Sequence, residues 1–221
     1  MSYQLYIGYI GEGTTDGRFL PEIIHKTVID VAFGLKNDIS IEEVVSINIK
    51  KRTFVETMME ASKKANDDSL SILCIHADAD SKSLEEVMEN KFQSLFQTLE
   101  KQDSKKYCKN IVAVIPITET ESWMMADKEL LKERINAKSL SNQDLGLEKN
   151  PEDYSNPKMV ISNAIRIAQQ GRTKRHRRDI SIADLYESMG QAISIDELRS
   201  IPSFRTFENN ISTALSKLGL S

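Results

Sequence analysis

The sequence lacks the features of membrane and exported proteins. No apolar run reaches the roughly 20 residues that a helix needs to cross a bilayer. The first residues carry no basic segment, and Glu12 interrupts the apolar stretch near the start of the chain, so no signal peptide is expected. We therefore expect a cytoplasmic protein without a membrane partner.

Cysteines and histidines are too few for two common kinds of site. Two cysteines, Cys74 and Cys108, build neither a disulfide framework nor a zinc site. Cys74 stands inside an apolar run at 70–75, which predicts a buried thiol. The three histidines show no H-x-x-x-H or H-E-x-x-H spacing, so a histidine-based metal site has little support.

A strong positive charge is also missing, because the formal net charge is −4. This balance predicts no overall attraction to nucleic acid. One segment, G-R-T-K-R-H-R-R at 171–178, is nevertheless basic and contains no acid. Its five positive side chains are Arg172, Lys174, Arg175, Arg177 and Arg178. The segment could bind nucleic-acid phosphates, or it could be a solvated loop or helix end, and both interpretations stay open.

The composition that remains is that of a globular protein, with 221 residues, of which 40% are hydrophobic and 28% charged. Apolar runs predict strands over 3–10, 44–49, 69–76 and 111–115, and helical spacing predicts helices over 16–32, 53–65 and 84–99. Strands that alternate with helices in this way indicate right-handed crossovers and a mostly parallel sheet.

The pattern changes after Trp123, where only helices are predicted, over 128–134, 157–169, 182–189, 195–201 and 204–218. We therefore expect an α/β core over residues 1–127, with its sheet flanked by helices, and a helical C-terminal extension over residues 128–221 packed on that core. Trp123 is expected to anchor the extension by packing, and stacking on a base is the alternative.

Acidic residues follow three of the predicted strands. They are Glu12 and Asp16, Asp78 and Asp80, and Glu119 and Glu121. Ligands of an open parallel sheet bind beyond the carboxyl ends of its strands, so these acids could converge on one site. Clustered carboxylates repel one another unless a cation neutralises them, and Mg²⁺ is a hard cation that takes oxygen ligands. We expect all six acids to be candidate metal ligands, although each one alone could be a helix cap or a solvated loop residue.

The order of these acids carries a family resemblance. Glu12-Gly13-x-x-Asp16, followed by a strand that ends in Asp78-x-Asp80, resembles the TOPRIM domain. This domain is shared by topoisomerases, bacterial primases, small RNA-processing nucleases and OLD-family nucleases. The resemblance covers about the first half of the chain and implies a TOPRIM or Rossmann-like sheet.

Three further motifs resemble an uncharacterised TOPRIM-like, OLD-nuclease-like family. They are P-I-T-E-T-E-S-W-M-M-A-D at 116–127, N-P-K at 156–158 and I-P-S-F-x-x-F at 201–207. Members of that family often accompany ABC-type ATPases in bacterial phage-defence loci. The resemblance implies that Glu12 acts as general acid or base and as metal ligand, and that Asp78 and Asp80 hold metal. Lys158 could reach the scissile phosphate, or it could be a solvated lysine at a helix start.

Of the activities that the resemblance implies, a nuclease remains. The 221 residues leave little room for the tyrosine domain of a topoisomerase, and no primase module can be recognised. We expect a Mg²⁺-dependent endonuclease acting on DNA or RNA, with Mn²⁺ or Ca²⁺ as possible substitutes. An ABC-type ATPase is the expected partner, in antiviral defence. The expected catalytic residues are Glu12, Asp78, Asp80 and Lys158. The alternatives are a non-catalytic regulatory subunit of the ATPase and an enzyme that transfers phosphoryl groups on nucleotides.

Overall fold

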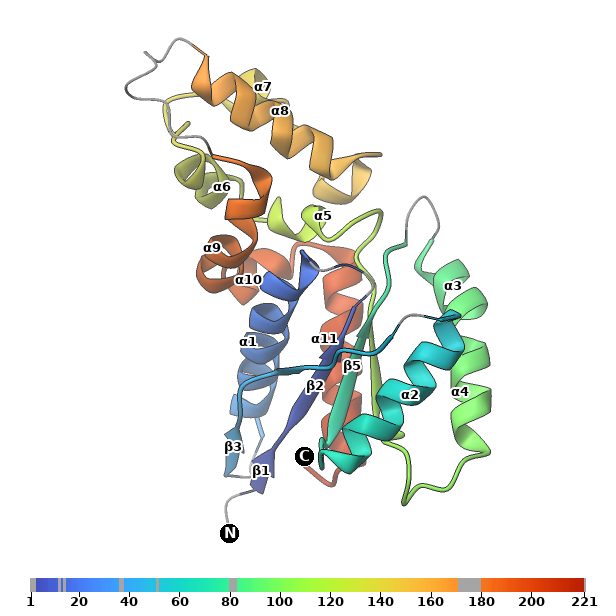
Figure 1. Ribbon diagram of the computed structural model, residues 1–221. Helices are drawn as coiled ribbons and strands as arrows, with labels where there is room; N and C mark the ends of the chain where they lie inside the picture. The colour runs from blue at the N-terminus through green and yellow to red at the C-terminus, as the bar shows by residue number, and fades with distance from the viewer. Residues whose placement is uncertain are drawn as a thin grey trace.

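A four-stranded parallel sheet forms the centre of the molecule (Figure 1). A computed structural model describes residues 3–11, 13, 15–35, 38–50, 52–79, 83–170 and 180–220. The sheet has the order β4-β2-β5-β6, with strands β2 (Ile7–Ile10), β4 (Val45–Ser46), β5 (Ile72–His76) and β6 (Ile111–Val114). A second pair of parallel strands, β1 (Tyr3–Leu5) and β3 (Ile39–Ile41), continues the edge formed by β2 and β4. The predicted α/β class with a mostly parallel sheet is confirmed.

The central strands are apolar because both faces of the sheet are covered. Every residue of β2, β5 and β6 is buried, as expected for parallel strands between two helical layers. Successive side chains point to opposite faces, so Ile72 and Cys74 belong to one core, whereas Leu73 and Ile75 belong to the other. Cys74 is a buried free thiol, as predicted.

Helices from different parts of the chain cover each face of the sheet. On one side lie α1 (Leu20–Phe33) and α11 (Pro202–Lys217), which pack against each other. On the other side lie α2 (Phe54–Asp67), α3 (Leu84–Val87) and α4 (Gln93–Glu100). Helices α3 and α4 form one continuous helix through the π-helical turn η2 (Met88–Phe92), and this continuous helix ends one residue beyond the predicted range 84–99. Capping boxes at Thr53 and Ser83 determine where α2 and α3 begin.

The remaining helices gather beyond the carboxyl end of the sheet (Figure 1). They are α5 (Glu121–Met124), α6 (Lys128–Arg134), α7 (Asn142–Leu145), η3 (Pro151–Asp153), α8 (Pro157–Gln169), η5 (Ile182–Asp184), α9 (Leu185–Ala192) and α10 (Ile195–Leu198). The described part of the chain contains no strand after Trp123, as predicted.

Trp123 joins this helical region to α11. Its side chain is fully buried, and its indole Nε1 donates a hydrogen bond to Ser203 Oγ at 2.8 Å. The ring centroid lies 5.3 Å from that of Phe204 and 5.7 Å from that of Phe207. The predicted packing role of Trp123 is confirmed, because a side chain buried in this way cannot stack on a base.

The sheet edge differs from the sequence prediction. The strand predicted over 44–49 contains only two residues, because β4 pairs with β2 only at Gly8↔Val45 and Tyr9↔Ser46. The strand predicted over 3–10 is interrupted at Tyr6, and β3 was not predicted at all. Edge segments pair on one side only, so their apolar pattern is weaker than that of central strands.

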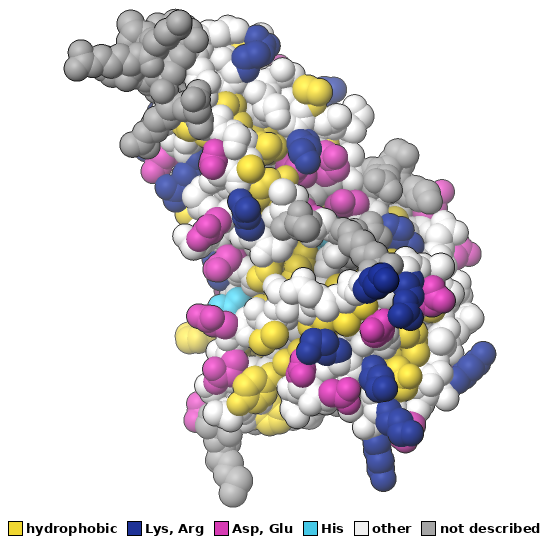
Figure 2. Space-filling model, in the orientation of Figure 1, with side chains coloured by type: hydrophobic (Ala, Val, Ile, Leu, Met, Phe, Trp, Pro, Cys, Tyr) yellow, Lys and Arg dark blue, Asp and Glu magenta, His cyan; other side chains and the backbone are white. Residues whose placement is uncertain are grey.

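Charged side chains of both signs are interspersed over the face of the molecule shown in Figure 2. No helix in the described ranges is long and apolar enough to cross a membrane.

Candidate metal centre

Two carboxylates and an imidazole meet at the carboxyl end of the sheet. Asp16 opens the short 3₁₀ helix η1 (Asp16–Arg18) after β2, His76 is the last residue of β5, and Asp78 follows it. Asp16 and His76 are buried, with His76 fully inaccessible to solvent. Each of the three residues offers one potential ligand atom, and these atoms lie within 4.8 Å of one another. This is the only such group of three or more among the described residues.

The hydrogen bonds of His76 leave one ring nitrogen available. Nε2 lies 3.1 Å from Asp78 Oδ1 and 3.4 Å from Thr120 Oγ1. A carboxylate accepts hydrogen bonds, so we assign the proton to Nε2 and a lone pair to Nδ1. Nδ1 is buried, has no hydrogen-bond partner in the described structure, and lies 3.9 Å from Asp16 Oδ2.

The separation between these two atoms suits one shared cation. Two ligands that each lie about 2.1 Å from an ion are up to about 4.2 Å apart. A carboxylate that holds the distal N–H of a ligand histidine is a common support in metal sites, and Asp78 occupies that position. The donor set therefore fits a divalent metal ion.

Two glycines allow the loop after β2 to approach this group closely. A Cβ atom at Gly11 would lie 2.3 Å from the Tyr9 hydroxyl and 3.4 Å from His76 Nδ1. A Cβ atom at Gly13 would lie 2.2 Å from Asp16 Oδ2. Both positions are therefore restricted to glycine for as long as Tyr9, Asp16 and His76 keep these positions.

The electrostatic environment of the group is negative. The hydroxyl of Tyr9 is buried without a hydrogen-bond partner in the described structure. The pKa of Tyr9 is raised, first by burial and then by the negative charges of Asp16 and Asp78. A bound cation would reduce this repulsion.

A second buried carboxylate, Glu121, lies next to the group. It is 3% exposed at the start of α5 and accepts a hydrogen bond from the buried hydroxyl of Tyr186 in α9. Lys158 Nζ lies 3.7 Å from Glu121 Oε1, and the Lys158 backbone N–H donates to Glu119 Oε2 at 3.4 Å. Burial is the largest cause of the raised pKa of Glu121, and the Tyr186 hydrogen bond opposes it.

The loop that connects β6 to α5 is strained. Thr118 has a φ of 69°, a left-handed conformation that is costly for a β-branched residue. Its hydroxyl donates to the carbonyl of Tyr154 at 3.5 Å. The next residues are Glu119, Thr120 and Glu121, so this strained turn positions the third acidic segment beside His76. Backbone strain of this kind clusters at functional sites.

The structure thus brings together several of the residues predicted from the sequence. Asp16 and Asp78 lie in the group of potential ligands, and Glu119, Glu121 and Lys158 form the neighbouring cluster. Glu119 and Glu121 are not part of the group of three, so their role as ligands stays a prediction. Glu12, Asp80 and the basic run of Arg172, Lys174, Arg175, Arg177 and Arg178 lie outside the described residues.

Sequence reasoning missed His76, Tyr9, Thr120 and Tyr186. The test for paired histidine spacing cannot detect a single histidine that joins acids from other strands. A usable signal was present, because His76 ends the apolar run of β5 two residues before Asp78. For Tyr186 we find no such signal.

Comparison with known families gives a match over nearly the whole chain. A family model described as "Domain of unknown function (DUF4276)" matches residues 11–212. The chain belongs to this family. The match includes the acidic loop after β2, the ends of β5 and β6, and all helices through α10. Comparisons with curated proteins and with solved structures gave no match.

Proposed function

We propose that this protein is a hydrolase that uses a divalent metal ion to cleave phosphodiester bonds in nucleic acid. The observation that carries the proposal is the pair formed by His76 Nδ1 and Asp16 Oδ2, 3.9 Å apart and buried. A buried nitrogen with a free lone pair beside a carboxylate is costly unless a cation or a proton joins them. Asp78 orients the imidazole and adds a second negative charge.

The carboxylates suit Mg²⁺, and the imidazole also suits a transition ion such as Mn²⁺. When bound, such an ion supplies charge that polarises a phosphate and lowers the pKa of a water molecule. Asp16 Oδ2 and His76 Nδ1 would hold it, and Asp78 would fix the imidazole by accepting its Nε2–H. Lys158 is half-exposed beside Glu121 and can approach the anionic phosphate as charge develops there. The Glu121–Tyr186 pair can hold a proton within the same site.

The TOPRIM resemblance supplies the remaining parts of the proposal. In that scheme Glu12 and Asp80 are further ligands, with Glu12 also acting as general acid or base. The basic run at 171–178 would hold the nucleic-acid backbone without reading its sequence. An ABC-type ATPase partner and a role in antiviral defence rest on this resemblance alone.

The test is cleavage by protein that has been stripped of metal with a chelator and then reloaded. Plasmid, single-stranded oligonucleotides and tRNA would be incubated with Mg²⁺, Mn²⁺ or Ca²⁺, and metal affinity would be measured by calorimetry. We expect Asp78→Asn to reduce metal affinity and cleavage by about 10- to 100-fold. Its melting temperature without metal should be unchanged or higher, because a like-charge repulsion is relieved.

Asp67→Asn is the matched control, since Asp67 is exposed at the end of α2 and away from the site. It should bind metal and cleave like the wild type. The proposal fails if the wild-type protein binds no divalent metal, or if it binds metal and cleaves none of the three substrates. A large loss of melting temperature in Asp78→Asn would instead assign Asp78 to the support of the fold.

A further inference from the structure

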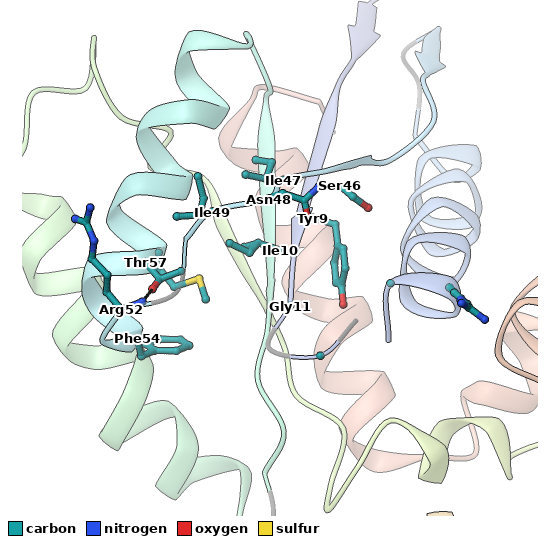
Figure 3. Close-up of a pocket in the computed structure, with 14 residues that line it drawn as sticks. Tyr9, Ile10, Gly11, Ser46, Ile47, Asn48, Ile49, Arg52, Phe54 and Thr57 are labelled. Atoms are coloured by element: carbon teal, nitrogen blue, oxygen red, sulfur yellow. Dashed lines mark hydrogen bonds between the residues drawn. The ribbon is translucent and has the colours of Figure 1, made fainter. Parts of the chain in front are cut away.

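A cavity of about 590 Å³ opens directly beside the candidate metal centre. Tyr9, Gly11 and Gly13 line the cavity and also border the metal centre. The opposite wall comes from the segment after β4 and from the first turns of α2 (Figure 3). The volume of the cavity is in the range of small-molecule sites.

One wall of the cavity is apolar. Ile10, Ile47, Ile49 and Met58 contribute aliphatic surface, and Phe54 lies at the start of α2 (Figure 3). The Phe54 ring is held by an edge contact with Phe92, with the centroids 5.4 Å apart. Such a wall accepts a flat apolar body such as a nucleobase.

Polar groups with free hydrogen-bonding capacity adjoin this wall. Ser46 and Asn48 are exposed, and neither side chain has a hydrogen-bond partner among the described residues. The amide of Asn48 offers both donors and an acceptor, the combination that pairs with the edge of a base.

Among the described residues that line the cavity, the two charged side chains are positive. Arg18 comes from η1, on the α1 side of the sheet, and Arg52 precedes α2 on the other side. No acidic residue lies among the described lining residues. Arg52 pairs with Glu60 at 3.8 Å, but both side chains are more than 40% exposed, so this contact is weak and Arg52 can turn towards another anion. The occupant should therefore carry negative charge at its polar end.

We infer that this cavity binds one nucleoside phosphate, with the base against the apolar wall and Asn48 at the base edge. Arg18 and Arg52 contact phosphate groups. The inference rests on the proposed function, because it identifies the occupant as the nucleotide next to the bond that is cleaved. A base inside this cavity cannot remain stacked in a duplex, so the substrate is single-stranded at that position.

Binding can be tested without cleavage, in chelator and without metal. The probes are a fluorescently labelled single-stranded oligonucleotide, as DNA and as RNA, its duplex, and a nucleoside monophosphate. The variants are Arg18→Ala/Arg52→Ala, which removes the charges, and Asn48→Trp, which fills the cavity. The matched controls are Lys63→Ala/Lys106→Ala and Asn163→Trp, which make similar changes at exposed positions outside the cavity.

We expect both cavity variants to bind the single strand at least about tenfold more weakly than the wild type and its controls. We expect the duplex to bind more weakly than the single strand. A mononucleotide that binds as tightly as the oligonucleotide would identify a free nucleotide as the source of the nucleoside phosphate, whereas weaker binding would identify the polymer.

The inference is overturned if the wild type binds none of the probes, or if the cavity variants bind them as well as their controls do. It is also overturned if the duplex binds as well as the single strand. These outcomes can be distinguished from failure of the proposed function. The proposed function fails when a protein that binds the oligonucleotide in this cavity does not cleave it, whichever divalent metal ion is added.

Discussion

His76 is the residue on which the candidate site depends. It ends a strand of otherwise apolar residues, and its environment is decided by three other segments. Asp78 and Thr120 contact Nε2, whereas Nδ1 faces Asp16. An imidazole held in this way keeps one tautomer, and a fixed lone pair is what a metal ligand requires.

Glu121→Gln tests whether the buried carboxylate is charged at neutral pH. The folded pKa of Glu121 lies above its ordinary value of 4.5, so the folded chain binds this proton more tightly than the unfolded chain does. Stability therefore falls as pH rises from about 4.5 through the folded pKa. Gln has no charge to desolvate. We expect the melting temperature of the variant, relative to the wild type, to increase between about pH 4 and about pH 8 in metal-free buffer.

Glu89→Gln, at an exposed position in η2, is the control and should show no such trend. Tyr186→Phe should instead lower the melting temperature relative to the wild type, because it removes the donor that stabilises the Glu121 carboxylate. An unsatisfied buried acceptor costs about 1–3 kcal/mol, so Tyr186→Phe should lower stability most at neutral pH. If the difference in melting temperature between Glu121→Gln and the wild type stayed constant over this pH range, the raised pKa of Glu121 would be contradicted.

At the scale of elements, a methyl group added at Gly13, between β2 and η1, would meet the candidate ligand Asp16. In Gly13→Ala the new Cβ would lie 2.2 Å from Asp16 Oδ2. The carboxylate is the end of a flexible side chain, so it can rotate away while the backbone stays in place. We expect Gly13→Ala to weaken Mn²⁺ binding by about tenfold, measured by calorimetry, with little change in melting temperature.

Gly17→Ala is the control for this prediction, because a Cβ at Gly17 would have no described atom within 4 Å apart from its own local backbone and chain neighbours. It should leave Mn²⁺ affinity unchanged. If Gly13→Ala bound metal as tightly as Gly17→Ala does, Asp16 would not be a ligand.

At the scale of the whole molecule, the C-terminal helix α11 completes the helical layer to which α1 belongs. Helix α11 packs against β6 and α1, and Phe204, Phe207 and Ile211 belong to the core cluster that also contains β5 residues. The segment over 128–221 therefore supplies part of the cover of the sheet.

A chain cut after Asp127 tests this arrangement. It would lose α11 and expose the apolar face formed by residues such as Ile72 and Val112. We expect residues 1–127 alone to lack a folded state, measured by circular dichroism and by amide dispersion in NMR spectra. In the full chain, Phe204→Ala should cost about 3–5 kcal/mol of unfolding free energy. A well-dispersed spectrum from the truncated chain would show that the core folds independently.

The central strands and most helices could be predicted from sequence because their signals are local. Buried strands such as 111–115 are short apolar runs, and amphipathic helices such as 157–169 repeat their apolar positions. The edge strand β3 was not predicted, and β4 is shorter than the strand predicted over 44–49, since pairing on one side imposes little pattern on two or three residues.

For the candidate site, the sequence by itself determined that acids follow three parallel strands, because the carboxyl ends of such strands share one edge of the sheet. Only the tertiary structure decided that His76 joins Asp16 and Asp78, and that Tyr186 holds Glu121. These contacts join residues as far as 65 positions apart. Contacts of that range depend on how the helical layers pack on the sheet, so no local periodicity in the sequence predicts them.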